Sequence, residues 1–481
     1  MDCQKRARNA QAKLLANPLF PSPGSYSDID YLSRLPTELL VLIAKSAHTD
    51  AIRQVEHPVP NVKAPSYLKP ILALAAISRR LRSIIIGESP FWSYIRINAN
   101  TVTEEAVITC LKRARKHPLT ILWIGGHTCD YGWSGMGCGC DARILSIIMR
   151  RSHQWLSFAM VAPAGYLDEF FCEWRQSHLS APILERIYVA KTSVPADPDP
   201  EEDDDYFIEG LFAVDIPSIQ HLQICQWPFL AHRTHLKTLT RLEFEAPDDG
   251  ALTFEELSAV ATDLVQLEYL NIHRALDFDR DEELRWRPDL ITWPSLLELV
   301  IRSETTEGGF IWRYLKLFKA PKLHKFVAIS PRKEDFDTDE TDASWIANNV
   351  PFVKEVTLLS PRVDGNTSQK LLAFFPKITH LSFCYSPCEH SFDSFFYPDG
   401  LSDTKIWPDL KSITLGQIQE EKLLRSIVDC LQRRHKDKRG IANIFIPGGQ
   451  PHMARELEVV GANLRVGDIP DLSYYSLGPR Q

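Results

Sequence analysis

The sequence has no apolar run long enough to cross a membrane. Its longest runs, such as Ile71 to Ile77, are far shorter than the roughly 20 residues that a bilayer-spanning helix needs. The first residues, Met1 to Phe20, are polar and lack the apolar core of a secretory signal. We therefore expect no membrane partner and a location in a reducing compartment, either the cytoplasm, the nucleus or both.

The sequence also has fewer basic than acidic residues: it contains 54 Lys and Arg residues and 62 Asp and Glu residues, which give a net charge of -8. A protein that coats nucleic acid would carry a basic face, so we expect no nucleic-acid partner. Cysteine is sparse as well, and ten residues scattered over 481 positions form no disulfide scaffold. A composition of 44% hydrophobic and 24% charged residues is typical of a globular protein large enough for more than one core.

Catalytic motifs are missing too: the sequence has no nucleophile elbow, Walker loop, dinucleotide glycine fingerprint or paired metalloprotease histidines in the required context. Two clusters offer metal-ligand chemistry, namely His127, Cys129, Cys138 and Cys140 in a Gly-rich loop, and Cys384, Cys388 and His390. Their spacing differs from the Cys-x-x-Cys pairs of structural zinc sites. We therefore expect no metal and no cofactor, and a metal-dependent enzyme built on the first cluster stays open as an alternative.

Residues 31–98 carry short apolar helical patterns. Leu35-Pro36 precedes a helix in which Leu39, Leu42 and Ile43 recur at i, i+3 and i+4. The stretch from Ile71 to Ile97 adds two apolar stripes and ends a helix at Gly87. The ordered set Leu-Pro-x-Glu-Leu, Ile-Ser-Arg-Arg-Leu and Ser-Pro-Phe-Trp resembles the F-box. The long gap after the first helix resembles the F-boxes of large families in mushroom-forming fungi.

A second pattern, a nine-residue phrase, recurs farther along the chain. Its common form is Pro-x-Leu-x-x-Leu-x-Ile, as in Trp293 to Ile301, and it predicts a turn into a short strand whose alternate residues point inward. The first apolar anchors stand 20 to 35 residues apart, at Leu184, Ile219, Leu239, Leu267, Leu296, Leu323, Val353, Ile378 and Leu410. Between the phrases we expect helical returns such as Thr253–Val265 and Glu421–Arg433. The phrase resembles the strand segment of leucine-rich repeats, which bury their apolar edges by stacking.

These patterns predict an α/β protein with a small N-terminal three-helix F-box followed by an irregular leucine-rich-repeat-like solenoid. The expected boundaries are a loosely ordered leader at 1–30, the F-box at 31–98, a repeat region that binds the target at 99–470 and a tail at 471–481. The acidic stretches Asp197–Asp205 and Glu334–Asp342 are expected to be solvated loops. An ordinary parallel α/β domain with strands that begin after proline remains the alternative for the repeats.

The resemblance implies a non-catalytic substrate receptor of a Skp/cullin/F-box ubiquitin ligase, which binds the Skp adaptor, and through it a cullin, and holds an unknown protein target. The candidates for adaptor binding are Leu35, Pro36, Leu39, Leu42, Ile43, Ile77, Leu81 and Trp92. Target binding is assigned to side chains expected on an exposed concave sheet, namely Arg241, Glu243, Tyr269, Asn271, His273, Glu298 and Arg302. The alternative function is a repeat-based interaction scaffold whose F-box-like helices only cap the solenoid.

Overall fold

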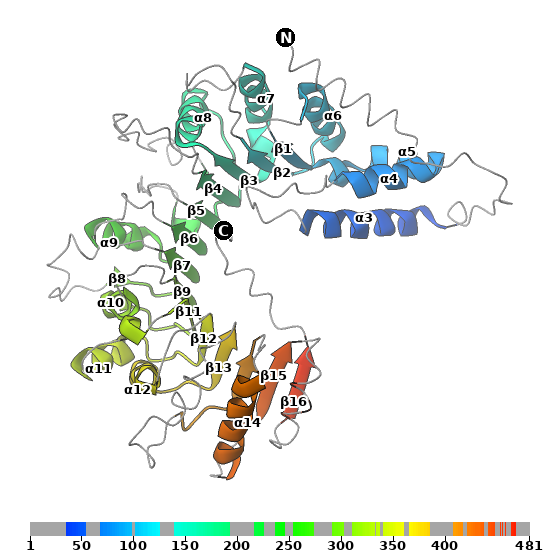
Figure 1. Ribbon diagram of the computed structural model, residues 1–481. Coiled ribbons are helices and arrows are strands. Elements are labelled where there is room, and N and C mark those ends of the chain that lie inside the picture. Colours follow the sequence, from blue (N-terminus) through cyan, green and yellow to red (C-terminus); the bar gives the residue numbers. More distant parts are fainter. Residues whose placement is uncertain are drawn as a thin grey trace, which may run out of the picture. The chain divides into compact units, whose positions relative to one another are not determined.

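A computed structural model of the 481-residue chain describes residues 35–53, 68–98, 102–125, 139–192, 216–225, 236–245, 254–273, 291–302, 310–331, 333–336, 340–359, 365–384, 407–416, 421–436, 441–447 and 463–467, with 453, 455 and 457 (Figure 1). Two compact units divide the chain. The first spans residues 1–184 and 192–202, and the second spans residues 185–191 and 203–480. Both are mixed α/β structures.

The first unit begins with three helices, α3 (Thr37–Arg53), α4 (Lys69–Ile77) and α5 (Arg79–Gly87), followed by the short η1 (Ser89–Trp92). Local chemistry fixes these boundaries. Pro70 stands in the first turn of α4, where its missing N–H loses no hydrogen bond. Ser78 separates α4 from α5 and caps the second helix, because its Oγ accepts a hydrogen bond from the Leu81 N–H at 3.1 Å.

A parallel sheet completes the first unit. Its strands β1 (Tyr94–Asn98), β2 (Leu119–Ile124) and β3 (Trp155–Ala162) pair in chain order. Helix α6 (Glu104–Ala114) connects the first pair, α7 (Gly139–Met149) and η2 (Ser152–Gln154) the second, and α8 (Ala164–Gln176) follows β3. Strand β1 lies within the segment predicted as the F-box, but it pairs with β2 of the sheet.

The second unit repeats a strand followed by a variable return. Its strands are β4 (Arg186–Lys191), β5 (His221–Cys225), β6 (Arg241–Glu245), β7 (Tyr269–His273), β8 (Ile291–Thr292), β9 (Glu298–Arg302), β10 (Phe318–Lys319), β11 (Lys325–Ile329), β12 (Glu355–Leu359), β13 (His380–Cys384), β14 (Ser412–Leu415), β15 (Asn443–Pro447) and β16 (Asn463–Gly467). Its helices are η3 (Leu236–Thr238), α9 (Phe254–Asp263), α10 (Phe310–Leu317), η5 (Lys333–Phe336), α11 (Glu340–Asn349), α12 (Gly365–Phe374) and α14 (Glu421–Lys436).

All the strands of the main sheet in the second unit are parallel and pair in chain order from β4 to β16, while the short β8 and β10 pair separately. The register is uniform, so the second residue of each strand from β5 to β15 forms one buried apolar row: Leu222, Leu242, Leu270, Leu299, Phe326, Val356, Leu381, Ile413 and Ile444. Helices α9 to α12 lie along one side of these strands (Figure 1).

The recurring phrase predicted this unit well. All nine apolar anchors are buried, and each lies between a turn or short 3-10 helix and a parallel strand, as expected. Both predicted helical returns are confirmed by α9 and α14. One expectation was wrong: Glu334–Asp342 is not a solvated loop, because η5 and the start of α11 lie in it, Asp335 is fully buried and Asp342 binds Lys316 at 2.7 Å. The leader, the tail and Asp197–Asp205 lie outside the described residues.

Within the described ranges, no helix combines the length and apolar character needed to cross a membrane.

Candidate protein-binding surfaces

Helix α3 has two apolar faces. One face packs into the first unit through Leu40 and Ala44, which are fully buried. The other face carries Leu39, Leu42 and Ile43, whose exposed fractions are 45%, 60% and 47%. The predicted i, i+3, i+4 stripe is therefore the outer face of the helix, and the inner face is marked by Leu40 and Ala44 at i and i+4.

Hydrogen bonds fix the three helices against one another. Arg80 of α5 donates from Nη2 to Thr37 Oγ1 at the start of α3, at 2.9 Å. Trp92 donates from Nε1 to the Ile85 carbonyl oxygen at 2.8 Å, which ties η1 to the end of α5. Leu72 and Ile77 of α4 and Ile86 of α5 remain exposed on this arrangement. The three helices thus present apolar side chains on a fixed framework.

The predicted adaptor-binding residues fall into two groups. Leu39, Leu42, Ile43 and Ile77 are exposed, and Pro36 is exposed beside the half-buried Leu35. Leu81 and Trp92, in contrast, are almost fully buried, so their prediction as contact residues is corrected to a role in the core. The reason is size, because a three-helix unit must bury most of its largest apolar side chains to be stable.

His48 is a buried titratable group on the inner face of α3. Its ring meets Phe91 edge-on, with 5.7 Å between the ring centroids. Burial lowers the pKa of His48 from 6.5 to about 4, because the charged imidazolium would lose its hydration there. The helical framework is therefore built around a neutral histidine.

The second candidate surface is the polar face of the sheet formed by β6, β7 and β9. The parallel register aligns Arg241 with Tyr269 and Glu298, Glu243 with Asn271, and Glu245 with His273 and Arg302. The structure thus brings the predicted target-binding residues together on one face, in three adjacent rows.

Glu243 is the centre of a charged network on this face. Arg241 donates from Nε to Glu243 Oε1 at 2.8 Å, and His221 Nε2 lies 3.3 Å from the same oxygen. Burial alone would raise the pKa of Glu243, but the hydrogen bond from His221 and the charge and hydrogen bond of Arg241 outweigh it, so the pKa is lowered. The Arg241 guanidinium also lies 3.5 Å from the centre of the Tyr269 ring.

The expectation that this strip is exposed was wrong for most of its members. Exposed fractions are 4% for Glu243, 1% for Asn271 and 2% for His273, and Tyr269 and Arg302 are also buried. Neighbouring strands lie only about 4.8 Å apart, so long side chains in one row cover one another. Accessible side chains remain in the row that begins the strands, namely His221, Arg241, Glu298, Lys325 and Glu355.

A histidine and hydroxyl cluster on strands β13 and β14 was not anticipated from the sequence. His380 Nδ1 lies 2.5 Å from Ser412 Oγ, and its Nε2 lies 3.1 Å from Ser382 Oγ and 3.0 Å from Thr414 Oγ1. Burial lowers the pKa of His380, the charge of Glu355 opposes this and that of Lys325 adds to it. The signal was present as His-x-Ser and Ser-x-Thr at matching strand positions.

The two predicted metal-ligand clusters lie largely outside the described residues. His127, Cys129, Cys138, Cys388 and His390 are not described, whereas Cys140 lies in α7 and Cys384 ends β13. In the part of the chain that the structure describes, no three His, Cys, Asp or Glu side chains gather as metal ligands. Cys110, Cys172, Cys225 and Cys430 form no disulfide bond.

No protein-family model matches the chain, and no curated protein sequence is significantly similar to it.

Proposed function

We propose that this protein is a substrate receptor of a Skp/cullin/F-box ubiquitin ligase. In this proposal helices α3 to α5 form the F-box and bind the Skp adaptor through Leu39, Leu42, Ile43 and Ile77, with Leu35 and Pro36 beside them. The second unit is a leucine-rich-repeat-like solenoid that holds the protein target. The protein then acts in the cytoplasm, the nucleus or both.

The observation that carries the proposal is the outer apolar face of α3. Three consecutive members of one helical stripe, at 45%, 60% and 47% exposure, stand on a helix whose opposite face is already packed. Covering such side chains contributes up to about 1.5 to 3 kcal/mol each when burial is complete. That gain must exceed the entropy lost on association, so a contiguous stripe supports binding better than scattered residues do.

Target binding is proposed for the accessible row of the sheet. Glu298 and Lys325 form an ion pair of 2.9 Å there, and Arg241 and His221 extend the row with positive or titratable groups. Partly exposed charges of alternating sign suit the rim of a protein contact, where they select the partner more than they strengthen binding. The buried rows behind them, with Glu243 and Asn271, keep this row in position.

No residue of the chain performs bond chemistry in this proposal. A receptor accelerates ubiquitin transfer by raising the effective concentration of target lysines beside a charged conjugating enzyme. The requirement on the protein is a stiff connection between its two binding surfaces.

Co-expression with a Skp adaptor tests the proposal. The full chain should co-purify with the adaptor, and Leu42→Asp should weaken the complex at least about tenfold, because it places a charge in the apolar contact. Leu297→Asp is the matched control, since Leu297 of the second unit is also an exposed leucine, at 44%. Absence of a complex with the unaltered chain, or equal weakening by both substitutions, would favour the interaction scaffold whose helices only cap the repeats.

A further inference from the structure

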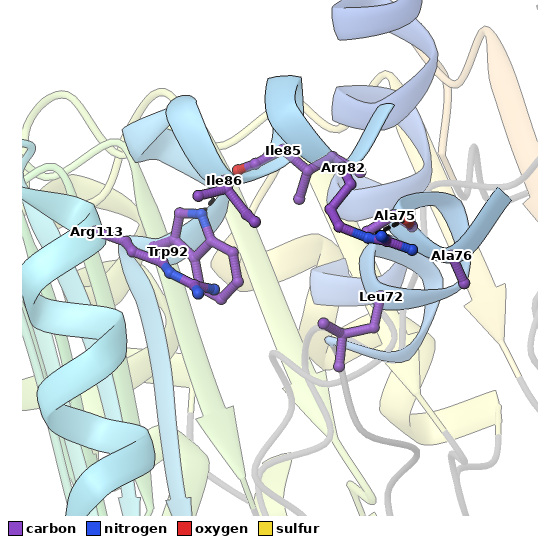
Figure 2. A pocket seen from close by; sticks show the side chains of 8 residues that line it. All are labelled: Leu72, Ala75, Ala76, Arg82, Ile85, Ile86, Trp92 and Arg113. Carbon is purple, nitrogen blue, oxygen red and sulfur yellow. Dashed lines mark hydrogen bonds between the residues drawn. The ribbon is translucent and has the colours of Figure 1, made fainter. Parts of the chain in front are cut away.

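A cavity of about 240 Å³ opens among the helices of the first unit (Figure 2). Residues from α4, α5, η1 and α6 line it: Leu72, Ala75, Ala76, Arg82, Ile85, Ile86, Trp92 and Arg113. An enclosed space of about 150 Å³ accommodates a benzene molecule, so this volume admits an aromatic or large aliphatic side chain. The lining is apolar except for the two arginines.

Both arginines are held in place by neighbouring groups. Arg82 donates from Nε to the Ala75 carbonyl oxygen at 3.1 Å, which leaves its terminal N–H groups as further donors. The Arg113 guanidinium lies 4.3 Å from the centre of the Trp92 ring. Figure 2 shows Arg113 against Trp92 on one side of the cavity and Arg82 with Ala75 on the other. A ligand would therefore meet two pre-positioned cations around an apolar floor.

The surrounding sequence is basic although the chain is acidic. Residues 68–125 contain nine Lys and Arg residues against three Glu, a net charge of +6, whereas the whole chain carries -8. Helices α4 and α5 contain no Asp or Glu. Glu104 and Glu105 stand in the first turn of α6, about 12 Å along the helix from Arg113. The charge around the cavity thus complements an acidic ligand.

We propose that this cavity binds an acidic linear segment of a separate partner protein, with one bulky apolar side chain in the cavity and flanking carboxylates on Arg82 and Arg113. The apolar floor requires the bulky side chain, since a polyanion alone would leave it uncovered. The planar guanidinium groups suit carboxylates, which they bind through paired hydrogen bonds. This site shares no residue with the adaptor surface proposed for α3 and Ile77, and does not depend on it.

The full chain should be titrated into fluorescein-labelled peptides, with anisotropy as the readout. Asp-Glu-Phe-Glu-Asp should bind roughly tenfold to a hundredfold more tightly than Asp-Glu-Ser-Glu-Asp, because only the first fills the cavity. Lys-Lys-Phe-Lys-Lys should not bind. Equal binding of the Phe and Ser peptides would indicate a general polyanion surface and overturn the proposal, as would no binding of any peptide.

Variants locate the binding site. Ala76→Trp, which fills the cavity from an exposed position, and Arg82→Glu should each weaken the Phe peptide at least about tenfold. Arg79→Glu is the matched control, because Arg79 is exposed on the same helix but does not line the cavity, and it should change affinity less than about threefold. If Ala76→Trp does not fold by circular dichroism, Ile86→Ser replaces it. Binding indifferent to the cavity variants would overturn the proposal.

Two further measurements distinguish a separate partner from this chain's own acidic stretch, and the peptide site from the proposed receptor function. Neutralising Asp197–Asp205 to Asn and Gln tests this chain's own acidic stretch as the occupant. Peptide binding that occurs only in the neutralised protein would assign the cavity to that stretch and overturn the separate partner. Adaptor co-purification is measured on the same variants, so a failure of the peptide site is distinguishable from a failure of the proposed receptor function.

Discussion

Two regions of this chain place apolar and polar side chains in opposite ways. Helices α3 to α5 keep leucine and isoleucine side chains such as Leu42 at the surface, whereas strands β6, β7 and β9 bury polar and charged ones such as Glu243 and Asn271. Both arrangements depart from the ordinary rule of apolar inside and polar outside. The difference shows which of the two regions can gain free energy by burying its side chains against a partner.

An exposed leucine destabilises a fold little, so its burial remains available to a partner. A buried polar group is different, since removing it from water is unfavourable unless hydrogen bonds replace that water. Arg241 and His221 provide this compensation for Glu243. The exposed apolar side chains of the helical region can therefore still be buried by a partner. The polar contacts of the sheet region stabilise its own fold instead.

The same leucine-to-alanine truncation in each region tests this difference in burial directly. Leu299→Ala removes a fully buried side chain from the apolar row and should lower the free energy of unfolding of the second unit by about 2 to 5 kcal/mol. Leu42→Ala removes the same atoms from an exposed position and should change stability by less than about 0.5 kcal/mol. Urea denaturation followed by circular dichroism measures both. Similar losses for the two variants would contradict the assignment of Leu42 to the surface.

The sequence predicted the framework of both regions because periodicity reports which residues must be buried. The phrase around Trp293 to Ile301 places Leu296, Leu299 and Ile301 inward, and all three are buried. The spacing between successive phrases varies, but each strand pairs with the next in the same register. Local pattern was sufficient here because every strand repeats one physical requirement, burial of the apolar row that contains its second residue.

The candidate sites were less predictable because they depend on packing between elements. Leu81 and Leu42 are both apolar helical residues, and nothing local distinguishes the buried one from the exposed one. The burial of Asn271 follows from its neighbours in adjacent rows, which are distant in sequence. The cavity beside Trp92 requires Arg113 of α6 to meet residues of α4, which spacing alone does not reveal.

Acidification would act on the helical region through the buried His48. His48 has a folded pKa of about 4 against 6.5 when unfolded, so between these values the unfolded chain takes up a proton that the folded chain does not. The contribution of neutral His48 to the free energy of unfolding is fully present above pH 6.5. The free energy of unfolding then falls by about 3 kcal/mol as pH decreases to about 4. Denaturation in urea at pH 7, 5.5 and 4.5 measures this loss.

A non-titrating replacement isolates the contribution of His48 from that of the carboxylates. His48→Leu keeps an apolar contact with Phe91 and should reduce the stability difference between pH 7 and pH 4.5 by about 2.5 kcal/mol, the part of the loss that falls between these pH values. His153, which is exposed in η2, offers the control, since His153→Leu should leave the pH profile of the wild-type protein unchanged. If the free energy of unfolding depends on pH equally in wild type and His48→Leu, the imidazole is solvated. The inner face of α3 would then not be buried at this position.

The sheet region can be tested at Asn271, where polar burial is least compensated. This side chain is 1% exposed, and neither its amide nitrogen nor its oxygen has a hydrogen-bond partner among the described residues. Asn271→Leu, which has similar volume, removes the buried polar group and should raise the free energy of unfolding by about 1 to 3 kcal/mol. Thr357→Val, a buried position in the same row three strands along on β12, is the matched replacement of a polar by an apolar side chain. A loss of stability in Asn271→Leu would mean that the amide is satisfied in solution, and this face would then resemble a well-paired polar core.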